Sequence, residues 1–105
     1  PQPAPALPAE QVEFFEKHVR PVLAENCYAC HGSKLAQSGL RVDGRAFLLR
    51  GMDGGRTALV PGDPEKSPLL KVLHFNDRVK MPPKGKLPQA QIDALTEWVR
   101  MGAPW

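Results

Sequence analysis

The residues with the most distinctive chemistry form one short run, Cys27-Tyr28-Ala29-Cys30-His31, which contains both cysteines of the chain. Two thiols at this spacing can add across the two vinyl groups of a haem and form thioethers. A histidine directly after the second thiol is held where its imidazole can bind the iron. The run therefore predicts one covalently bound haem c, attached through Cys27 and Cys30, with His31 as the proximal iron ligand.

Three other uses of a C-x-x-C pair have less support. A dithiol redox pair sits at a strand-to-helix junction, and no strand pattern precedes Cys27. A structural zinc site needs four ligands, and only His18 and His74 remain to complete one, because His31 is poorly placed to bind the same ion as Cys30. A disulfide would close a very short loop and constrain the unfolded chain little.

Length and composition indicate one small domain rich in loops. The chain has 105 residues, of which 42% are hydrophobic and 24% charged, as in soluble globular proteins. It also has 12 prolines and 9 glycines, so long stretches must be turns. A buried haem would add apolar mass to the core of such a chain.

Residues 1–8 form a Pro/Ala-rich stretch that is typical of an extended linker, which leaves residues 9–105 for the domain.

Two segments have apolar residues at helical spacing. They span about residues 9–25, where Pro21 should kink or restart the helix, and about residues 88–101, where Pro88 suits the first turn and Gly102 the end. The apolar positions are Val12, Phe15, Val19, Val22 and Leu23 in the first segment and Ile92, Leu95 and Val99 in the second. Contact between these helices is expected through Phe15, Leu23, Leu95 and Trp98, with Phe14 as an alternative.

The middle of the chain gives weaker signals. Asp43 could cap a short helix that stops at Gly51, and Asp63 or Ser67 could cap another that ends near Leu73. Residues 51–55 and 80–85 read as loops, and no alternating strand pattern or internal repeat is present. The expected fold class is all-α.

The charge pattern argues against nucleic acid as a partner. The formal net charge is +3, but the basic residues are scattered along the chain. Their densest group is Arg78, Lys80, Lys84 and Lys86, which could be a solvated loop or a docking rim for an acidic redox partner. No window approaches the length of about 20 apolar residues that a membrane-spanning helix needs.

Several stretches, taken in order, resemble the planctomycete-type cytochrome c domain, a class I-like c-type cytochrome family. Around the haem motif they are Val19-Arg20-Pro21-Val22-Leu23, Ser38-Gly39-Leu40-Arg41-Val42-Asp43, Val60-Pro61-Gly62-Asp63-Pro64-Glu65-Lys66-Ser67, Lys80-Met81-Pro82-Pro83-Lys84-Gly85, Trp98-Val99-Arg100 and Gly102-Ala103-Pro104. The resemblance covers nearly everything from Glu13 to Trp105. It implies a small cytochrome fold in which the N- and C-terminal helices pack together around one covalently bound haem, with a loop-rich middle.

Met81 is the expected distal iron ligand. Pro82 and Pro83 stiffen the chain after it, so its thioether can be presented to iron at little cost in ordering entropy. By resemblance, the Met-Pro-Pro motif carries this role. Four alternatives remain open, although a methionine is more often core filler and a histidine on a helix is often solvated. They are Met52, Met101, His18 and His74.

Three further residues could contact the haem. Tyr28 lies inside the motif and is expected near the haem edge, and Arg41 or Arg45 could bind a propionate through a charged donor.

A haem iron with histidine on one side and methionine on the other is coordinatively full, which favours one-electron exchange over catalysis. We therefore expect an electron-transfer module that is not itself an enzyme. The alternative is a haem-based ligand sensor or weak peroxidase with a labile distal ligand.

The resemblance further implies an exported, periplasmic or otherwise extracytoplasmic bacterial protein. It also implies a redox partner protein or a fused larger domain. The isolated domain is expected to be monomeric.

Overall fold

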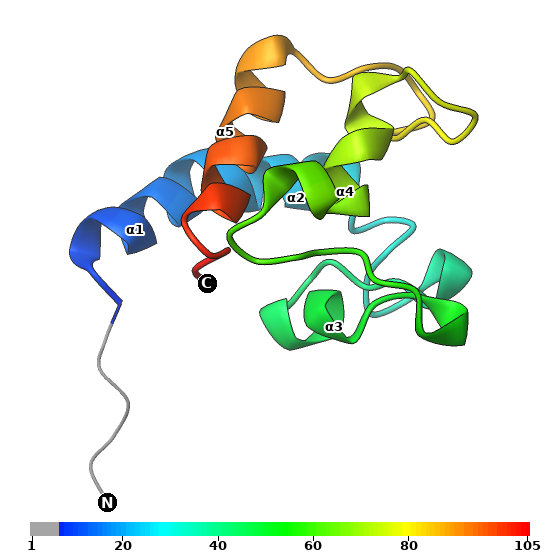
Figure 1. The fold of residues 1–105 in the computed structure, drawn as a ribbon, viewed down its shortest axis with the longest axis horizontal. Helices are drawn as coiled ribbons and strands as arrows, with labels where there is room; N and C mark the ends of the chain where they lie inside the picture. Colours follow the sequence, from blue (N-terminus) through cyan, green and yellow to red (C-terminus); the bar gives the residue numbers. More distant parts are fainter. Residues whose placement is uncertain (1–6) are drawn as a thin grey trace, which may run out of the picture.

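Two long helical segments cross each other in the computed structural model, which describes residues 7–105 (Figure 1). The first comprises α1 (Ala9–Phe14), a π-helical turn (Phe15–Val19) and α2 (Arg20–Asn26). Pro21 lies in the first turn of α2, so the predicted restart at this proline is confirmed. Proline has no N–H to donate to the carbonyl four residues earlier, and a widened turn before it accommodates that loss.

The second long segment is α5 (Gln89–Arg100), which packs against the π-helical turn. Pro88 is the residue before the helix rather than part of its first turn, with extended backbone at ψ 143°. After α5 the chain turns back, so that the indole Nε1 of Trp98 donates to the carbonyl of Pro104 at 2.6 Å. The Phe15 and Trp105 rings lie 4.6 Å apart between their centroids, which closes this end of the core.

The expected contact between the first and last helices is confirmed by burial. Its four members are at most 2% exposed: Phe15, Leu23, Leu95 and Trp98. Val12, which the periodicity placed on the same face, is instead 45% exposed. Val12 is exposed because α1 lies to one side of the point where α5 crosses the first helical segment, and α1 buries none of its residues (Figure 1).

Short helices and turns form the middle of the chain. They are α3 (Arg45–Arg50), α4 (Pro68–Lys71) and 3₁₀ turns at Gln37–Gly39, Asp53–Gly55, Pro64–Lys66 and Val72–His74. Within the described residues, β structure is limited to one isolated bridge between His31 and Ala36. The all-α prediction is therefore confirmed.

Helix capping departs from the prediction at both aspartates. The Asp63 carboxylate accepts from the Lys66 N–H at 3.2 Å and caps the short 3₁₀ turn Pro64–Lys66, not the helix that was expected to end near Leu73. Asp43 does not cap α3, whose N-cap is Gly44. The carboxylate of Asp43 is instead held by Arg41, which competes successfully for its oxygens.

Ser67 ties the two sides of the turn before α4 together. Its side chain is fully buried, and its Oγ accepts from the Val60 N–H at 2.9 Å and lies within hydrogen-bond distance of the carbonyls of Val60 and Asp63. A buried hydroxyl is tolerated only where its partners are supplied, as they are here.

Across residues 7–105, no helix has both the length and the apolar character needed to cross a membrane.

Candidate haem site

The C-x-x-C-H run forms a tight turn at the end of α2. The N–H of Cys27 still donates to the carbonyl of Leu23 at 2.9 Å, in helical fashion. The N–H groups of Cys30 and His31 then both donate to the carbonyl of Cys27, at 3.3 and 2.9 Å. These bonds fold the run back on itself, so that both thiols and the imidazole reach the same cavity.

That cavity has a volume of about 270 Å³ and is built from segments far apart in the sequence. Cys27, Cys30 and His31 lie on its wall together with Met52 and Met81. Most of the remaining wall is apolar: Leu40, Val42, Ala58, Pro68, Leu69, Val72, Leu73, Val79, Pro82 and Pro83. Its polar lining residues are Asn26, Gln37, Ser38 and Arg56.

The His31 ring is oriented by a backbone group. Its Nδ1 lies 3.3 Å from the carbonyl of Leu40, an acceptor, so the tautomer that makes this hydrogen bond carries its proton on Nδ1. The lone pair of Nε2 then stays free to bind a metal. The backbone of His31 is fixed as well, because its carbonyl accepts from the N–H of Val42 at 2.8 Å.

The environment of Cys27 does not suit a dithiol redox pair. Burial, and to a smaller extent the neighbouring Cys30, raises the pKa of the Cys27 thiol to about 11. Reactive dithiols depend on a depressed pKa that makes the thiolate available near neutral pH. The structure thus weakens the dithiol alternative for this motif.

Two of the five candidate distal ligands line the cavity, and three do not. Met81 and Met52 are the two; Met101, His18 and His74 lie elsewhere. Met81 is held by its N–H, which donates to the carbonyl of Val72 at 3.0 Å, and its peptide bond to Pro82 is cis.

Met52 is the first residue of the glycine-containing turn 52–56. There its N–H donates to the carbonyl of Arg56 at 2.8 Å.

Arg41 and Arg45, predicted as propionate partners, do not line this cavity. Arg41 donates two hydrogen bonds to Asp43, at 3.0 and 2.8 Å, and lies 3.7 Å over the ring of Phe47. The hydrogen bond from Arg41 holds the pKa of Asp43 below its usual value. Arg45 donates to the carbonyls of Ala103 and Gly102, at 2.9 and 3.2 Å, and so fixes the C-terminal turn.

Arg56 is the cavity-lining cation that the sequence analysis missed. Its Nε donates to the carbonyl of Asp53 at 3.2 Å, and the described residues offer no other hydrogen-bond partner to its guanidinium. The only local feature of the sequence that could have pointed to Arg56 is its position directly after Gly54-Gly55, because a glycine turn often redirects the chain.

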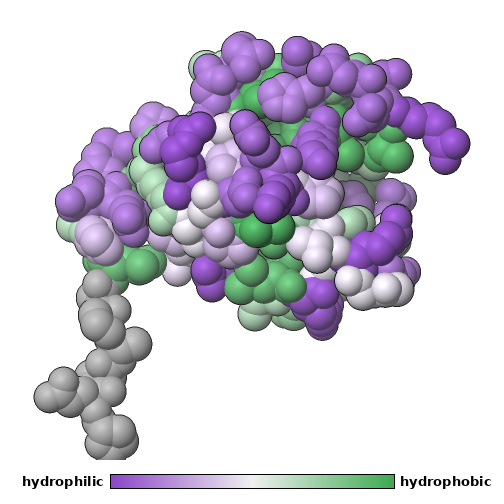
Figure 2. Space-filling view, in the orientation of Figure 1, coloured by the Kyte–Doolittle hydropathy of each residue, from purple (hydrophilic) through white to green (hydrophobic). Residues whose placement is uncertain are grey.

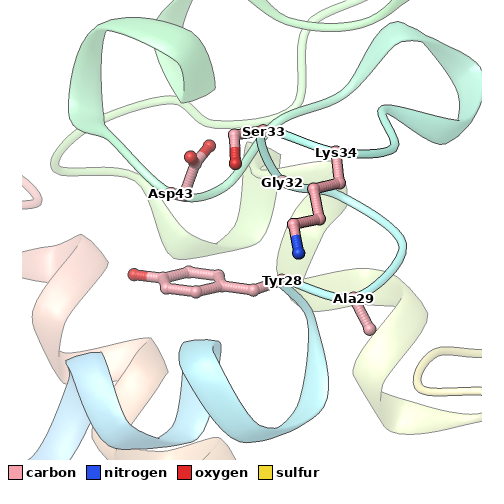
Figure 3. A pocket seen from close by; sticks show the side chains of 6 residues that line it. All are labelled: Tyr28, Ala29, Gly32, Ser33, Lys34 and Asp43. Atoms are coloured by element: carbon pink, nitrogen blue, oxygen red, sulfur yellow. The ribbon is translucent and has the colours of Figure 1, made fainter.

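Tyr28 does not line the haem cavity but a second cavity, of about 260 Å³. Figure 3 shows its ring below the carboxylate of Asp43, with the Lys34 side chain pointing into the space beside it. The Tyr28 hydroxyl is buried and has no hydrogen-bond partner among the described residues. Burial raises the pKa of Tyr28, and the Arg20 charge offsets part of that effect.

The donors and the cavity fit a covalently held haem. Two thiols, an imidazole with a free Nε2 and two thioethers surround one mainly apolar space. The fold is all-α; its first helical segment leads into the motif, and its last helix packs against that segment. This fold and this site together define the class of small c-type cytochromes.

Comparison with known families agrees with that class. Residues 27–85 match the family described as Planctomycete cytochrome C, over more than half of the chain, and the protein belongs to this family. The matched stretch begins at the first haem cysteine and includes Met81-Pro82-Pro83. No curated protein and no solved structure matches the chain. The domain is accordingly a haem-binding c-type cytochrome module.

Proposed function

We propose that this module transfers electrons, using one haem c held by Cys27 and Cys30, with His31 and Met81 as the axial ligands of its iron. The observation that carries the proposal is the shared cavity. It gathers the motif at the end of α2 and a methionine from the loop before α5 around one space. An iron with both axial positions taken by protein exchanges single electrons and has no open site for oxygen or peroxide.

Each residue in this proposal has a defined task. The carbonyl of Leu40 orients His31, and the Val72 carbonyl anchors the backbone of Met81. The apolar wall lowers the local dielectric, which together with a thioether ligand raises the reduction potential of such a centre.

We further propose Arg56 as the partner of a haem propionate, in place of Arg41 and Arg45. A partly buried carboxylate is stabilised by a charged donor, and the terminal nitrogens of Arg56 are available at the cavity. Arg56→Gln should leave the covalent haem in place and lower the reduction potential measured by redox titration, because it removes a positive charge. Arg45→Gln serves as the matched control and should leave the potential near that of the wild type.

One observation favours a second candidate, a haem-based ligand sensor or weak peroxidase. The described backbone hydrogen bonds of the 78–86 segment are only Met81 N–H to Val72 and Gly85 N–H to Pro82, at 3.0 and 3.2 Å. A methionine on so lightly anchored a loop could be displaced by an external ligand.

Carbon monoxide binding to the ferrous holoprotein distinguishes the two functions. We expect slow, incomplete binding at neutral pH, because Met81 must first leave the iron. Rapid, stoichiometric binding by the wild type would favour the sensor or peroxidase. A Met81→Ala holoprotein is the control and should bind carbon monoxide at least ten times faster than the wild type.

We propose residues 9–105 as the cytochrome domain, with any catalysis carried out by fused or partner domains. Membership of a c-type cytochrome family also supports an extracytoplasmic location. The linker predicted for residues 1–8 lies mostly outside the described residues.

A further inference from the structure

Basic residues occur along the whole chain, but the excess of positive over negative charge comes from one short segment, which we call the basic loop (residues 78–86). It contains Arg78, Lys80, Lys84 and Lys86 and no acidic residue. The remainder of the chain carries ten basic and eleven acidic residues, so the whole net excess of +3 arises from this loop. A charge distribution this uneven gives the molecule a distinct positive end.

The four charges of the basic loop are available to a partner. All four side chains belong to exposed residues. The ion pairs in the described part of the chain are Lys17–Glu13, Arg20–Glu16, Arg41–Asp43 and Arg100–Glu97, and none involves the loop. The other parts of the molecule therefore neutralise much of their charge internally, while the basic loop does not.

The basic loop also forms part of the haem cavity. Val79, Met81, Pro82 and Pro83 line that cavity, interleaved with the basic residues along the chain. Val79 is 51% exposed, the largest value among the exposed hydrophobic side chains of residues 7–105. In Figure 1 the loop projects at the end of the molecule away from α1, and Figure 2 shows hydrophilic side chains along this edge with hydrophobic atoms between them.

We infer that the basic loop is the docking surface for a partner protein whose contact surface is rich in carboxylates. The inference rests on the proposed electron-transfer function, since it places the partner beside the wall of the haem cavity. Exposed lysines and an arginine steer an acidic surface towards the loop, and Val79 supplies an apolar contact at its centre. Docking there brings the partner next to the residues that would enclose the haem.

Two other polyanions fit the loop less well. Stable binding to an anionic membrane uses an amphipathic helix with large apolar anchors, and the loop has no helix and only one exposed valine. Single-stranded nucleic acid is held by aromatic stacking platforms, and residues 78–86 contain no aromatic side chain.

The test uses poly-L-glutamate as the probe and the ferrous holoprotein as the target. Backbone amide shifts in NMR spectra should change mainly in residues 76–87, and the affinity should fall steeply as salt is raised. The variant Arg78→Gln/Lys80→Gln/Lys84→Gln/Lys86→Gln should bind at least ten times more weakly. A control variant has the same change in net charge outside the loop: Lys17→Gln/Arg50→Gln/Lys66→Gln/Arg100→Gln. Its affinity for poly-L-glutamate should fall by less than about threefold.

Three results would overturn the inference. The first is an equal loss of affinity in the two quadruple variants, which would show that only net charge matters. The second is a set of shifts centred outside the basic loop. The third is tighter binding to phosphatidylglycerol vesicles or to an oligonucleotide than to poly-L-glutamate at the same salt concentration.

The NMR experiment detects binding of poly-L-glutamate to the basic loop whichever residue is the distal ligand of the iron. Failure of docking is thereby distinguished from failure of the proposed electron transfer, which the carbon monoxide experiment tests separately.

Discussion

The two ends of this molecule are stabilised in different ways. At the end formed by α2, α5 and the C-terminal turn, large side chains pack against one another. Trp98 is fully buried there, and its indole is hydrogen bonded to the carbonyl of Pro104. At the other end, the 52–56 turn and the basic loop line a cavity of about 270 Å³. Among the described residues the basic loop has only two backbone hydrogen bonds, so we expect its packing to depend on the group that binds beside it.

At one end, the stability of the fold comes from the packing of the chain itself. At the other end, we expect the bound haem to provide part of the packing. The helical end has the burial and packing of an ordinary protein core. The cavity end supplies donors, an apolar wall and unpaired positive charge. Substitutions at the first end should therefore change stability more than the spectrum of the haem, and substitutions at the second should do the reverse.

The largest expected loss of stability comes from Trp98→Ala. Removing a fully buried aromatic side chain of this size costs about 3–5 kcal/mol. Urea unfolding of the holoprotein measures the loss, and the haem spectrum of the folded fraction should stay that of the wild type. Leu69→Ala, in the cavity wall, is the contrasting variant and should change the spectrum at a smaller cost in stability. If Trp98→Ala changed the haem spectrum and Leu69→Ala caused the larger loss of stability, the proposed difference between the two ends would be wrong.

An intermediate effect is expected for Ser67→Ala. The substitution leaves the N–H of Val60 without its partner in a buried site, which costs about 1–3 kcal/mol. Thermal unfolding of the holoprotein measures it, with Ser33→Ala, at an exposed position, as the control. A change below about 0.5 kcal/mol would show that the turn before α4 does not depend on this hydroxyl.

The smallest effect is expected for Asp43→Asn, and it should depend on pH. The ion pair with Arg41 is open to solvent, which screens it, so its loss at pH 7 should cost less than either substitution above. The pKa of Asp43 is lowered in the folded state, so the pair stabilises the protein above the unfolded-state pKa of an aspartate. This contribution is lost as pH falls through the lower folded-state pKa.

Urea unfolding at several pH values measures this prediction. The wild type and the variant should converge in stability at acid pH. A stability difference that stays constant down to strongly acidic pH would rule out the ion pair as its cause.

Local sequence patterns predicted the helical end well. The periodicity of residues 9–25 and 88–101 located both long helices to within a residue or two, and Pro21 marked the restart of α2. The same patterns could not show that α1 extends past α5, so Val12 shares the helical spacing of the buried positions although it is exposed. Helical periodicity shows which residues share a face, but not how far the partner helix extends along that face.

At the cavity end, the sequence shows residues that are neighbours along the chain but not contacts that form only on folding. The haem motif is contiguous, so Cys27, Cys30 and His31 could be identified as a set. The partners of Arg41 and Arg45 could not, because Arg45 binds carbonyls almost 60 residues away. Arg56 was missed for the same reason, since only folding brings its turn to the cavity.

The most direct test of the proposed ligation compares Met81→Ala with Met52→Ala in the covalently loaded holoprotein. Both methionines line the cavity, so the two variants remove the same side chain from the same wall. The absorption spectrum of the reduced protein reports the coordination of the iron. We predict that Met81→Ala abolishes six-coordinate low-spin character and that Met52→Ala retains it. An unchanged spectrum in Met81→Ala, or its loss in Met52→Ala, would contradict the assignment of Met81 as the distal ligand.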